Sequence, residues 1–450
     1  MRRWWPLVAV CLGTFVFLLD TTVLSVALPR VGAGLSAGPA ELQWVVTVYP
    51  LVLAVLTLSA GALADRFGAR AVYAAGLAVF GAASLVCGLA PDVRVLIAAR
   101  AVQGVGGAAL AVTGFALLGA VYRGPDLGRA MGAFAAVTGL GAAAGPVIGG
   151  VLTQYAGWRW VFLLNVPFVA VTLALALRVR EGGGGGARTR TDVPGTAAFA
   201  VCAGALTYAL NRAGSGGWGA WPVPAALAVS AVALAVLVRV ERRRPDPLLD
   251  VRLFARASFS AVMVCVLAST ASFAALVYTS LWLQSGLGLG PVRAGLALLP
   301  LALASCATSL VAGKRLHGRS PRAVLAAGLL LAGAGCALQA GLDAGSTAGS
   351  VTAGLVVTGV GVGLTGPVTG AAVLGALPPE RAGMAAGAMT TFRQLGQTVG
   401  VAVFGILFRQ GGGAAHAGLN RVLVAAAVAG LAGAALAGAL GPRRAPAAAR

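Results

Sequence analysis

The stretch LSAGALADRFGARAVYAAGLAVFGAAS, residues 58–84, occurs a second time in this chain in altered form. Residues 310–336, LVAGKRLHGRSPRAVLAAGLLLAGAGC, align to it without a gap at an offset of 252, and AG, RAV, AAGL and GA recur in register. Both copies consist of two apolar runs joined by a short charged segment. A repeat of this kind predicts two halves of similar fold.

Around this repeat the chain is a series of long apolar segments. It is 59% hydrophobic and 10% charged, whereas soluble domains carry about 25% charged residues, which excludes a soluble enzyme, a disordered protein and a secreted disulfide scaffold. A bilayer core needs about 20 apolar residues in a helix, and fourteen stretches qualify. They are residues 5–28, 43–64, 71–90, 94–118, 130–153, 159–178, 193–212, 218–240, 258–283, 291–312, 322–342, 349–374, 383–408 and 418–440. These stretches lack the alternation of apolar and polar residues that is typical of transmembrane strands. They therefore predict an all-α polytopic membrane protein.

Placed on these fourteen spans, the repeat relates spans 2–5 to spans 10–13. A second match, at an offset of 255, sets Gly104–Gly106 on Gly359–Gly361, and Gly141 and Gly145 on Gly396 and Gly400. We therefore predict a six-helix half at 1–180, a linker with two inserted helices and a basic loop at 181–257, a second six-helix half at 258–442, and a tail at 443–450. Parallel six-helix repeats are typical of one class of secondary transporter, in which the substrate binds between the halves.

The charge of the chain reports its orientation in the membrane. Lys and Arg number 33 against 12 Asp and Glu, but they fall in short gaps between apolar runs, whereas nucleic-acid-binding proteins gather such charge on a soluble face. With fourteen spans, 24 basic residues lie on the side of the termini, 7 lie on the other side, and Arg100 and Arg393 lie within spans. The positive-inside rule places both termini in the cytoplasm. We predict a multi-pass protein of the plasma (inner) membrane that binds no nucleic acid.

The sequence lacks the usual patterns of metal and enzyme sites. Its six cysteines stand singly in apolar runs, without a Cys-x-x-Cys or Cys/His cluster, so no metal site or disulfide framework is expected. No Walker motif occurs, and the predicted spans hold one acidic residue and no histidine. We expect neither an enzyme nor an ATP-driven pump, and no cofactor.

Two predicted spans carry isolated charged groups. Span 1 contains FLLDTTVLSVALP at 17–29, in which Asp20 is the one acidic residue within a predicted span. Intramembrane carboxylates are costly and usually face a cavity and serve function, although Asp20 could also act only in helix packing. Span 4 contains ARAVQGVGG at 99–107, with Arg100 followed one turn later by Gln103. The alternative for Arg100 is a side chain that reaches to the membrane interface.

Two further segments carry a regular pattern. GALADRFGAR, residues 61–70, joins spans 2 and 3 and is either a tight charged turn or a latch in which Asp65 faces a helix N-terminus or a basic group of the other half. Span 5 reads GLGAAAGPVIGG at 139–150. Its Gly141, Gly145 and Gly149 form one small-residue face, and Pro146 bends the helix.

These segments resemble motifs of the major facilitator superfamily, and specifically of its fourteen-span drug:proton antiporters. GALADRFGAR resembles the signature loop of the superfamily, matched here at Gly61, Asp65, Arg66, Gly68 and Arg70. The resemblance implies that Asp65 and Arg66 govern the conformational switch without touching substrate. The second copy is degenerate, since His317 aligns with Asp65.

The motifs in spans 1, 4 and 5 extend this resemblance. FLLDTTVLSVALP and RAVQGVGG resemble the span-1 and span-4 motifs, and the resemblance links Arg100, with Asp20, to proton transfer. The span-5 string resembles a motif of exporters that importers lack, which favours efflux. It is matched at Gly141, Gly145, Pro146, Gly149 and Gly150.

Span 13 reads TTFRQLGQTVG at 390–400 and places Arg393, Gln394 and Gln397 on one side of the helix. Three polar groups in one span are costly unless they line a water-filled cavity. With Gln103 they are therefore candidate cavity and substrate-binding residues. Hydrogen bonding between helices without substrate contact is the alternative.

Together these features predict a proton-coupled secondary active transporter of the major facilitator type. It would export drugs, antibiotics or other amphipathic small molecules, aromatic or cationic ones among them, by alternating access of the two halves. Its partners would be the substrate, protons and the lipid bilayer, and we expect a monomer. The alternatives are a dedicated exporter of one endogenous metabolite or antibiotic, a lipid flippase, or a non-transporting sensor on the same fold.

The predicted topology can be tested by labelling. Cysteine introduced at Gly184 should not react with a membrane-impermeant thiol reagent in intact cells, because Gly182–Gly186 and Arg242–Arg244 are predicted to be cytoplasmic. It should react in everted vesicles. Ser346→Cys, between predicted spans 11 and 12, is the control and should show the reverse pattern. Labelling of Gly184→Cys from outside intact cells would overturn the fourteen-span topology.

Overall fold

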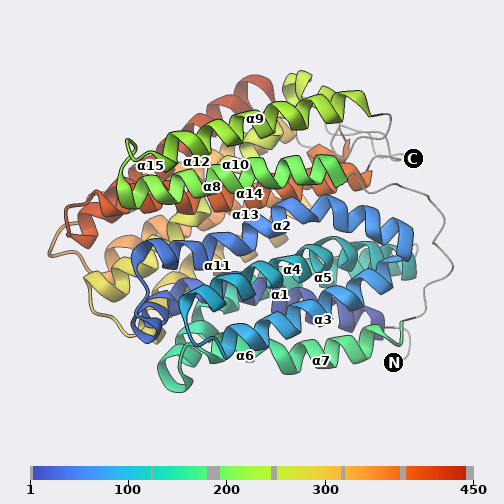
Figure 1. Ribbon diagram of the computed structural model, residues 1–450, viewed down its shortest axis with the longest axis horizontal. Coiled ribbons are helices and arrows are strands. Elements are labelled where there is room, and N and C mark those ends of the chain that lie inside the picture. The colour runs from blue at the N-terminus through green and yellow to red at the C-terminus, as the bar shows by residue number, and fades with distance from the viewer. Residues whose placement is uncertain are drawn as a thin grey trace.

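The structure, a computed structural model, describes residues 4–122, 125–179, 193–244, 251–315, 320–375 and 382–441. Every regular element in these ranges is a helix. The long helices run side by side, and α1 begins at the same end of the molecule at which α15 ends (Figure 1). We call this the near end and the opposite one the far end.

The helices form two bundles and an inserted hairpin. The N-terminal bundle consists of α1 (Trp5–Leu35), α2 (Pro39–Phe67), α3 (Ala69–Gly88), α4 (Val93–Val121), α5 (Pro125–Val151) with a π-helical turn at Leu152–Ala156, α6 (Trp160–Leu163) and α7 (Asn165–Ala176). The hairpin consists of α8 (Val193–Gly216) and α9 (Pro222–Arg243), followed by a 3-10 turn at Val251–Ala255. The C-terminal bundle consists of α10 (Ala257–Leu281) with a π-helical turn at Trp282–Gly286, α11 (Pro291–Arg315), α12 (Pro321–Gln339), a 3-10 turn at Ala348–Val351, α13 (Thr352–Gly375), α14 (Ala382–Arg409) and α15 (Ala415–Leu440).

Each of the fourteen predicted stretches contains helix, and α6 and α7 share the sixth. Several helices are longer than the apolar runs that predicted them, because backbone hydrogen bonding continues into the interfacial residues. α1 continues through Pro29 to Leu35, and α9 continues to Arg243 and so includes Glu241, which is buried. The predicted segment Gly182–Gly186 and the tail 443–450 lie outside the described residues.

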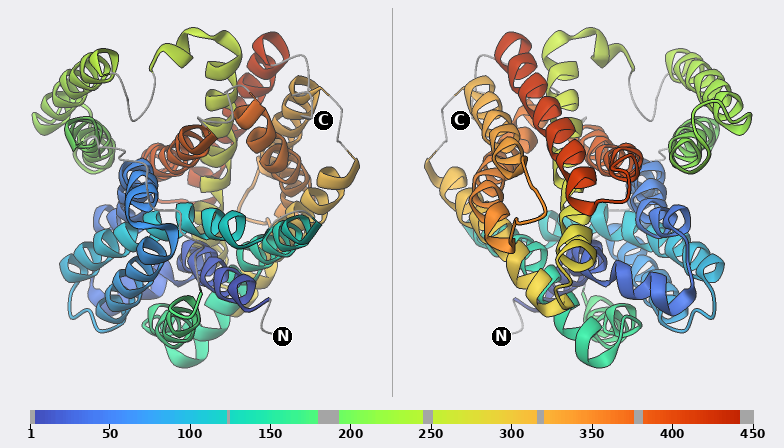
Figure 2. Two further views of the ribbon diagram at one scale, coloured as in Figure 1. Left: turned by 90° about the vertical axis from the view of Figure 1, so that its right-hand side faces the viewer. Right: turned by 90° about the vertical axis from the view of Figure 1, so that its left-hand side faces the viewer.

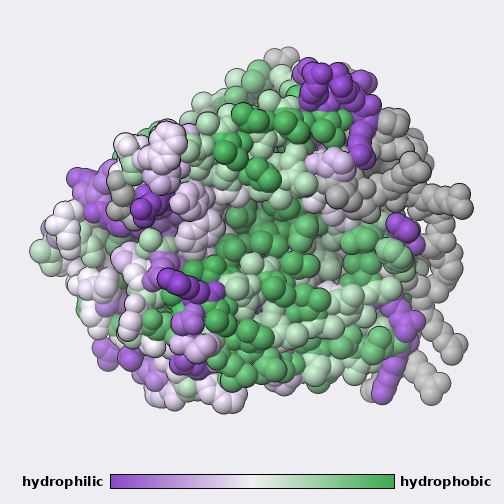
Figure 3. All heavy atoms as spheres, viewed as in Figure 1, coloured by the Kyte–Doolittle hydropathy of each residue, from purple (hydrophilic) through white to green (hydrophobic). Residues whose placement is uncertain are grey.

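The surface has the distribution of a protein in a bilayer. Among the described residues, ten helices are long and apolar enough to cross a membrane, and Trp160–Ala176 is a shorter apolar segment. On the face shown in Figure 3, hydrophobic residues cover the middle and hydrophilic residues gather toward the two ends. In a bilayer, the hydrophobic middle would contact the hydrocarbon of the lipid, and the hydrophilic ends would contact water.

Two seams join the bundles. α2 packs against α14, and α5 packs against α11. The inserted hairpin stands at the periphery (Figure 2), where α8 packs against both α2 and α14. Since α2 and α14 belong to different bundles, the hairpin lies over the first of the two seams.

The repeated segments make the same helix contacts in both bundles. A Cβ added at Gly76 of α3 would lie 3.2 Å from the Gly106 carbonyl oxygen of α4, and one at Gly328 of α12 would lie 3.0 Å from that of Gly361 in α13. Lipid tails are as apolar as the helix surfaces, so close packing of small residues, rather than the hydrophobic effect, holds such helices together.

The buried apolar residues divide differently at the two ends. At the far end one cluster contains residues from both bundles, including Val31, Trp158, Trp282 and Leu298. Toward the near end there are two separate clusters, one around Phe80 in the N-terminal bundle and one around Phe259 in the C-terminal bundle. The bundles are therefore closed against each other at the far end.

The packing of α5 on α1 gives a stability prediction. A Cβ at Gly145 would overlap Thr22 Oγ1 and lie 2.8 Å from Thr22 Cβ. Gly145→Ala should therefore lower stability by about 1–3 kcal/mol through overpacking, although alanine has the higher helix propensity. Gly204→Ala on α8, where a Cβ meets nothing within 4 Å, is the control. Thermal unfolding of both variants in one detergent checks this, and equal melting temperatures would refute it.

Candidate functional site

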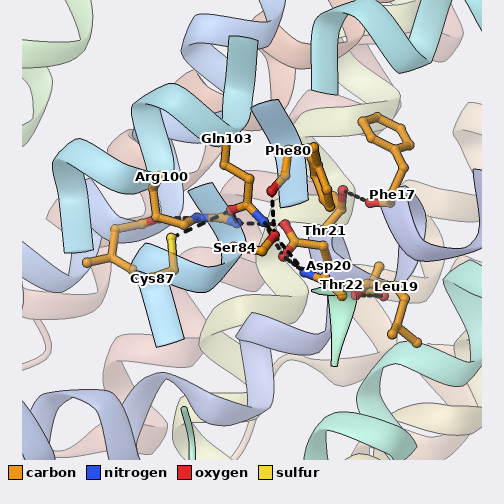
Figure 4. A network of polar contacts seen from close by, with 12 residues as sticks. Phe17, Leu19, Asp20, Thr21, Thr22, Phe80, Ser84, Cys87, Arg100 and Gln103 are labelled. Carbon is orange, nitrogen blue, oxygen red and sulfur yellow. Dashed lines mark hydrogen bonds and ion pairs between the residues drawn. The ribbon is translucent and has the colours of Figure 1, made fainter. Parts of the chain in front are cut away.

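Asp20 and Arg100 form an ion pair inside the N-terminal bundle. The Arg100 Nη1 donates to Asp20 Oδ2 at 2.6 Å, and the side chains are 2% and 0% exposed. Asp20 comes from the middle of α1 and Arg100 from the first half of α4 (Figure 4). Both side chains of the pair are buried, whereas the arginine of the Arg129–Asp126 pair is exposed. The alternative in which Arg100 reaches the membrane interface does not occur in this structure.

Three further polar side chains complete the coordination of the carboxylate. Gln103 Nε2 and Asn165 Nδ2 each donate to Asp20 Oδ1 at 2.9 Å. Ser84 Oγ accepts from the same two amides, at 2.8 and 3.3 Å, and Gln103 Oε1 accepts from Arg100 Nη1 at 2.6 Å. The network thus ties together α1, α3, α4 and α7. Figure 4 shows the side chains of Asp20, Ser84, Arg100 and Gln103 pointing toward one another.

Aromatic rings and backbone enclose the guanidinium. The Arg100 Cζ lies 4.3 Å from the centre of the Tyr49 ring and 5.8 Å from that of Phe162. The Nε points to the Val45 carbonyl oxygen at 3.4 Å. A cation against an aromatic face gains energy when it is desolvated. The enclosure removes water from the pair, so each charge depends on the other for its stabilisation.

Glycines on α4 create the space for this arrangement. A Cβ at Gly107 would lie 2.7 Å from the Tyr49 hydroxyl oxygen, and one at Gly104 would lie 2.8 Å from the Tyr49 carbonyl oxygen. The small residues beside Arg100 therefore allow α2 to approach closely enough for Tyr49 to cover the guanidinium.

Sequence reasoning identified part of this site. Asp20 and Arg100 meet, and Gln103, taken as a cavity residue, is fully buried in the network instead of lining an accessible surface. Ser84, Asn165 and Tyr49 were missed. Asn165 offered one signal, since it is an amide within the apolar run of the sixth predicted span. Ser84 and Tyr49 offered none, because serine and tyrosine are common in apolar helices.

The loop motif at residues 61–70 lies outside the polar network around Asp20. Gly68 joins α2 to α3 with a φ of 89°, a backbone conformation that glycine adopts without strain. Arg66 is exposed with its guanidinium 5.0 Å from the centre of the Phe67 ring, and Arg70 donates to the Leu177 carbonyl of α7's C-cap. A Cβ at Gly61 would make an ordinary contact with Val112 of α4. Asp65 lies in α2, but its side chain is outside the described part.

The span-5 motif contacts both bundles. Gly141, Gly145 and Gly149 pack on α1, and a Cβ at Gly149 would lie 2.7 Å from the Val23 carbonyl oxygen. On another side of α5, a Cβ at Gly150 would lie 2.6 Å from the Pro291 carbonyl oxygen of α11, and Pro146 packs against Gly295 of α11. Gly396 and Gly400 of α14 pack in the same way on α10, the counterpart of α1.

The three polar residues of α14 differ in accessibility. Gln394 is buried with 6% exposure, Gln397 is half-buried, and Arg393 is exposed. They lie in a different bundle from Asp20. The structure therefore contains two separate polar regions, the buried network around Asp20 and the α14 residues near the seam with α2.

Comparison with known proteins agrees with this architecture. Residues 10–401 match the Major Facilitator Superfamily. The chain therefore belongs to this superfamily of membrane transporters, and it is an integral membrane protein.

Several relatives carry names that describe drug or antibiotic resistance, and some of these names also describe export. The chain is 36% identical over 402 residues to the multidrug resistance protein Stp of Mycobacterium tuberculosis (strain CDC 1551 / Oshkosh), covering 89% of this chain and 74% of the relative. It is 35% identical over 410 residues to the puromycin resistance protein pur8 of Streptomyces alboniger, covering 89% and 81%. The tetracenomycin C resistance and export protein of Streptomyces glaucescens is 32% identical over 408 residues, covering 90% and 76%. These relatives indicate a transporter rather than an enzyme and support drug export.

The Asp20–Arg100 ion pair leads to a prediction about the stability of the fold. Arg100→Leu leaves the Asp20 carboxylate buried without its cation, which costs about 3–5 kcal/mol of unfolding free energy. Adding Asp20→Asn removes the uncompensated charge, so the double variant should be more stable than Arg100→Leu alone. Arg94→Gln, which changes an exposed arginine on the same helix, is the control and should shift stability by about 0.5 kcal/mol or less.

Unfolding of the unaltered protein, Arg100→Leu, Asp20→Asn and the double variant in one detergent completes a double-mutant cycle, with Arg94→Gln measured beside it. A double variant no more stable than Arg100→Leu would mean that the two charges do not depend on each other.

Proposed function

We propose that this chain is a proton-coupled antiporter that exports amphipathic small molecules, drugs or antibiotics among them, by alternating access. In this proposal it spans the plasma (inner) membrane fourteen times, has both termini in the cytoplasm, and works as a monomer without a cofactor. The fold, the family and the names of the relatives support export. The buried Asp20–Arg100 pair is the observation that carries the proton coupling.

The environment of Asp20 suits a group that gains and loses a proton during transport. Protonation would cancel its charge and leave Arg100 with Gln103 Oε1, the Val45 carbonyl oxygen and two aromatic rings as its remaining partners. The amides of Gln103 and Asn165 both donate to Asp20 Oδ1. A protonated carboxyl can itself donate, and the Asn165 Oδ1, which has no hydrogen-bond partner among the described residues, is an acceptor that rotation of this amide would present.

A continuous path of packed groups connects Asp20 with the other bundle. Thr22 and Val23 follow Asp20 on α1 and pack on Gly145 and Gly149 of α5. The next positions on α5, Pro146 and Gly150, pack against α11. We propose that a change at Asp20 shifts α1 against α5 and so alters the α5–α11 seam. Such contiguous contacts can carry coupling between sites if the elements have two arrangements.

The distribution of the apolar clusters supports alternating access. One cluster joins the two bundles at the far end, whereas the clusters toward the near end are separate. If the near end is cytoplasmic, the structure is the state closed to the outside. Opening of the far end would then require separation of the shared cluster.

The loop at 61–70 is the proposed switch. It lies at the near end, where the clusters of the two bundles are separate, and far from the buried network. Gly68 makes the sharp connection between α2 and α3, and we propose that Asp65 and Arg66 bias the equilibrium between the two states without contacting substrate. An effect on this equilibrium alters turnover while leaving the binding site intact.

The names of the relatives also favour a narrower candidate. One relative is named for multidrug resistance and two are named for a single antibiotic, so the chain could be a dedicated exporter of one compound. A resistance and accumulation panel over chemically varied compounds, in cells with and without the protein, separates the two. Protection against many unrelated compounds supports the multidrug exporter, and protection against one supports the dedicated exporter.

Replacement of Asp20 tests proton coupling. Asp20→Asn nearly keeps the shape of the side chain but cannot titrate, so it should abolish pH-driven accumulation of amphipathic dyes in everted vesicles. It should also abolish substrate-induced proton release from the purified protein in weak buffer. Asp343→Asn, in an exposed loop at the far end, should leave both intact.

Proton release that persists in Asp20→Asn would assign the proton to another group. Arg100→Lys should retain more transport than Arg100→Ala but less than the unaltered protein, because an ammonium group lacks the planar fork of the guanidinium.

A further inference from the structure

The accessible charge in the interior of this protein is positive, and we propose that Arg393 binds the negatively charged group of an exported organic anion. This inference rests on the proposed export function and adds the chemical class of the substrate. The class is an amphipathic carboxylate or phenolate, which differs in the sign of its charge from the cationic compounds that the sequence alone favours.

The position of Arg393 on α14 is set by the neighbours of that helix. Thr391 donates to the Ala54 carbonyl of α2 at 3.1 Å, and a Cβ at Gly396 would lie 3.0 Å from the Leu267 Cα of α10. Leu395 belongs to the apolar cluster with Ala203 of α8, on the side of the peripheral hairpin. At about 100° per residue, Arg393 lies about 160° around the helix from Leu395. It therefore faces inward, between α2 and α10.

Arg393 is also deep along the membrane axis. It lies eleven residues from the start of α14, which corresponds to about 17 Å at 1.5 Å per residue. The side chain is exposed even though α14 packs against α2, α8, α10, α13 and α15. A charged group that is both enclosed and accessible lines an internal space that water can enter, and this is the environment that charged residues inside membranes require.

The guanidinium of Arg393 is available to a ligand. No hydrogen bond or ion pair joins it to any described residue, whereas Arg100 is fully engaged. Gln397 lies one turn further along the same side of α14 and is half-buried. Together they offer a planar fork of donors and a neighbouring amide, a combination suited to a carboxylate.

A cationic substrate would find no comparable partner. Asp20 is fully buried and engaged by Arg100, Gln103 and Asn165. The other acidic side chains that the structure describes lie at helix ends, in loops or on the peripheral hairpin: Glu41, Asp92, Asp126, Glu241 and Asp343. The electrostatic potential around Arg393 in the interior therefore favours an anion. A cation would be repelled by Arg393 unless another group supplied a negative charge.

A matched series of probes tests the charge preference directly. 1-Pyrenebutyrate, 1-pyrenebutanol and 1-pyrenebutylammonium share one aromatic body and differ in charge, and their fluorescence reports binding to the purified full chain. The unaltered protein should bind the butyrate more tightly than the other two. Arg393→Gln should weaken butyrate binding by about tenfold or more and leave the alcohol nearly unchanged. Arg393→Lys should keep part of the preference because it keeps the charge.

Two controls separate substrate binding from other effects. Arg94→Gln removes an exposed positive charge at the far end and should not change the preference. Thermal unfolding of each variant establishes that the variant is folded. If Arg393→Gln does not fold, the binding measurements are made on Arg393→Lys, which should still prefer the butyrate.

The outcomes distinguish this inference from the proposed function. If pH-driven transport in everted vesicles occurs but the unaltered protein shows no preference for the anion, export stands and the anion site is wrong. Equal losses of binding for all three probes in Arg393→Gln would show a structural role and overturn the site. Loss of anion preference in this variant, with binding of the alcohol retained, supports it even in the absence of transport.

Discussion

A carboxylate and a guanidinium held together away from water determine how the N-terminal bundle is built. The charges of Asp20 and Arg100 stabilise each other in this buried setting, and the amides of Gln103 and Asn165 donate to the carboxylate. These contacts bring side chains from α1, α3, α4 and α7 to one point, and Tyr49 of α2 closes it. The polar groups therefore fix which helix faces meet, a task that apolar contacts alone perform poorly in lipid because they do not discriminate between faces.

Small residues are the second condition for this arrangement. The glycines beside Arg100 admit Tyr49, and the glycine face of α5 admits α1 at the turn that follows Asp20. The same kind of contact recurs between α10 and α14, where Gly396 and Gly400 replace Gly141 and Gly145. The C-terminal bundle has the packing without a second buried ion pair among its described residues. The two bundles thus share their helix packing and differ in their polar groups. The N-terminal bundle encloses the Asp20–Arg100 ion pair, whereas the C-terminal bundle has the accessible Arg393.

Much of the fold could be predicted from the sequence because membrane helices can be recognised by the length and apolar composition of their segments. The fourteen helical stretches, the small-residue face of α5 and the unusual positions of Asp20 and Arg100 were all readable in this way. The partners of Asp20 were not. Which side of α3 or α7 faces α1 depends on packing, so no pattern linked Ser84 or Asn165 to Asp20, although Asn165 stands out as an amide within an apolar run. For the same reason the sequence grouped Arg393 with Gln394, although the structure exposes one and buries the other.

The position of the α8–α9 hairpin makes the two seams unequal. α8 packs on α2 from one bundle and on α14 from the other, so under the proposed alternating access it would not stay fixed to both bundles as they move against each other. In that proposal it would slide on one of them while still covering the α2–α14 seam on the outside of the molecule. No helix of the described chain takes a similar place over the α5–α11 seam. Molecules dissolved in the bilayer would thus meet one seam that the hairpin covers and one seam that no described helix covers in this way.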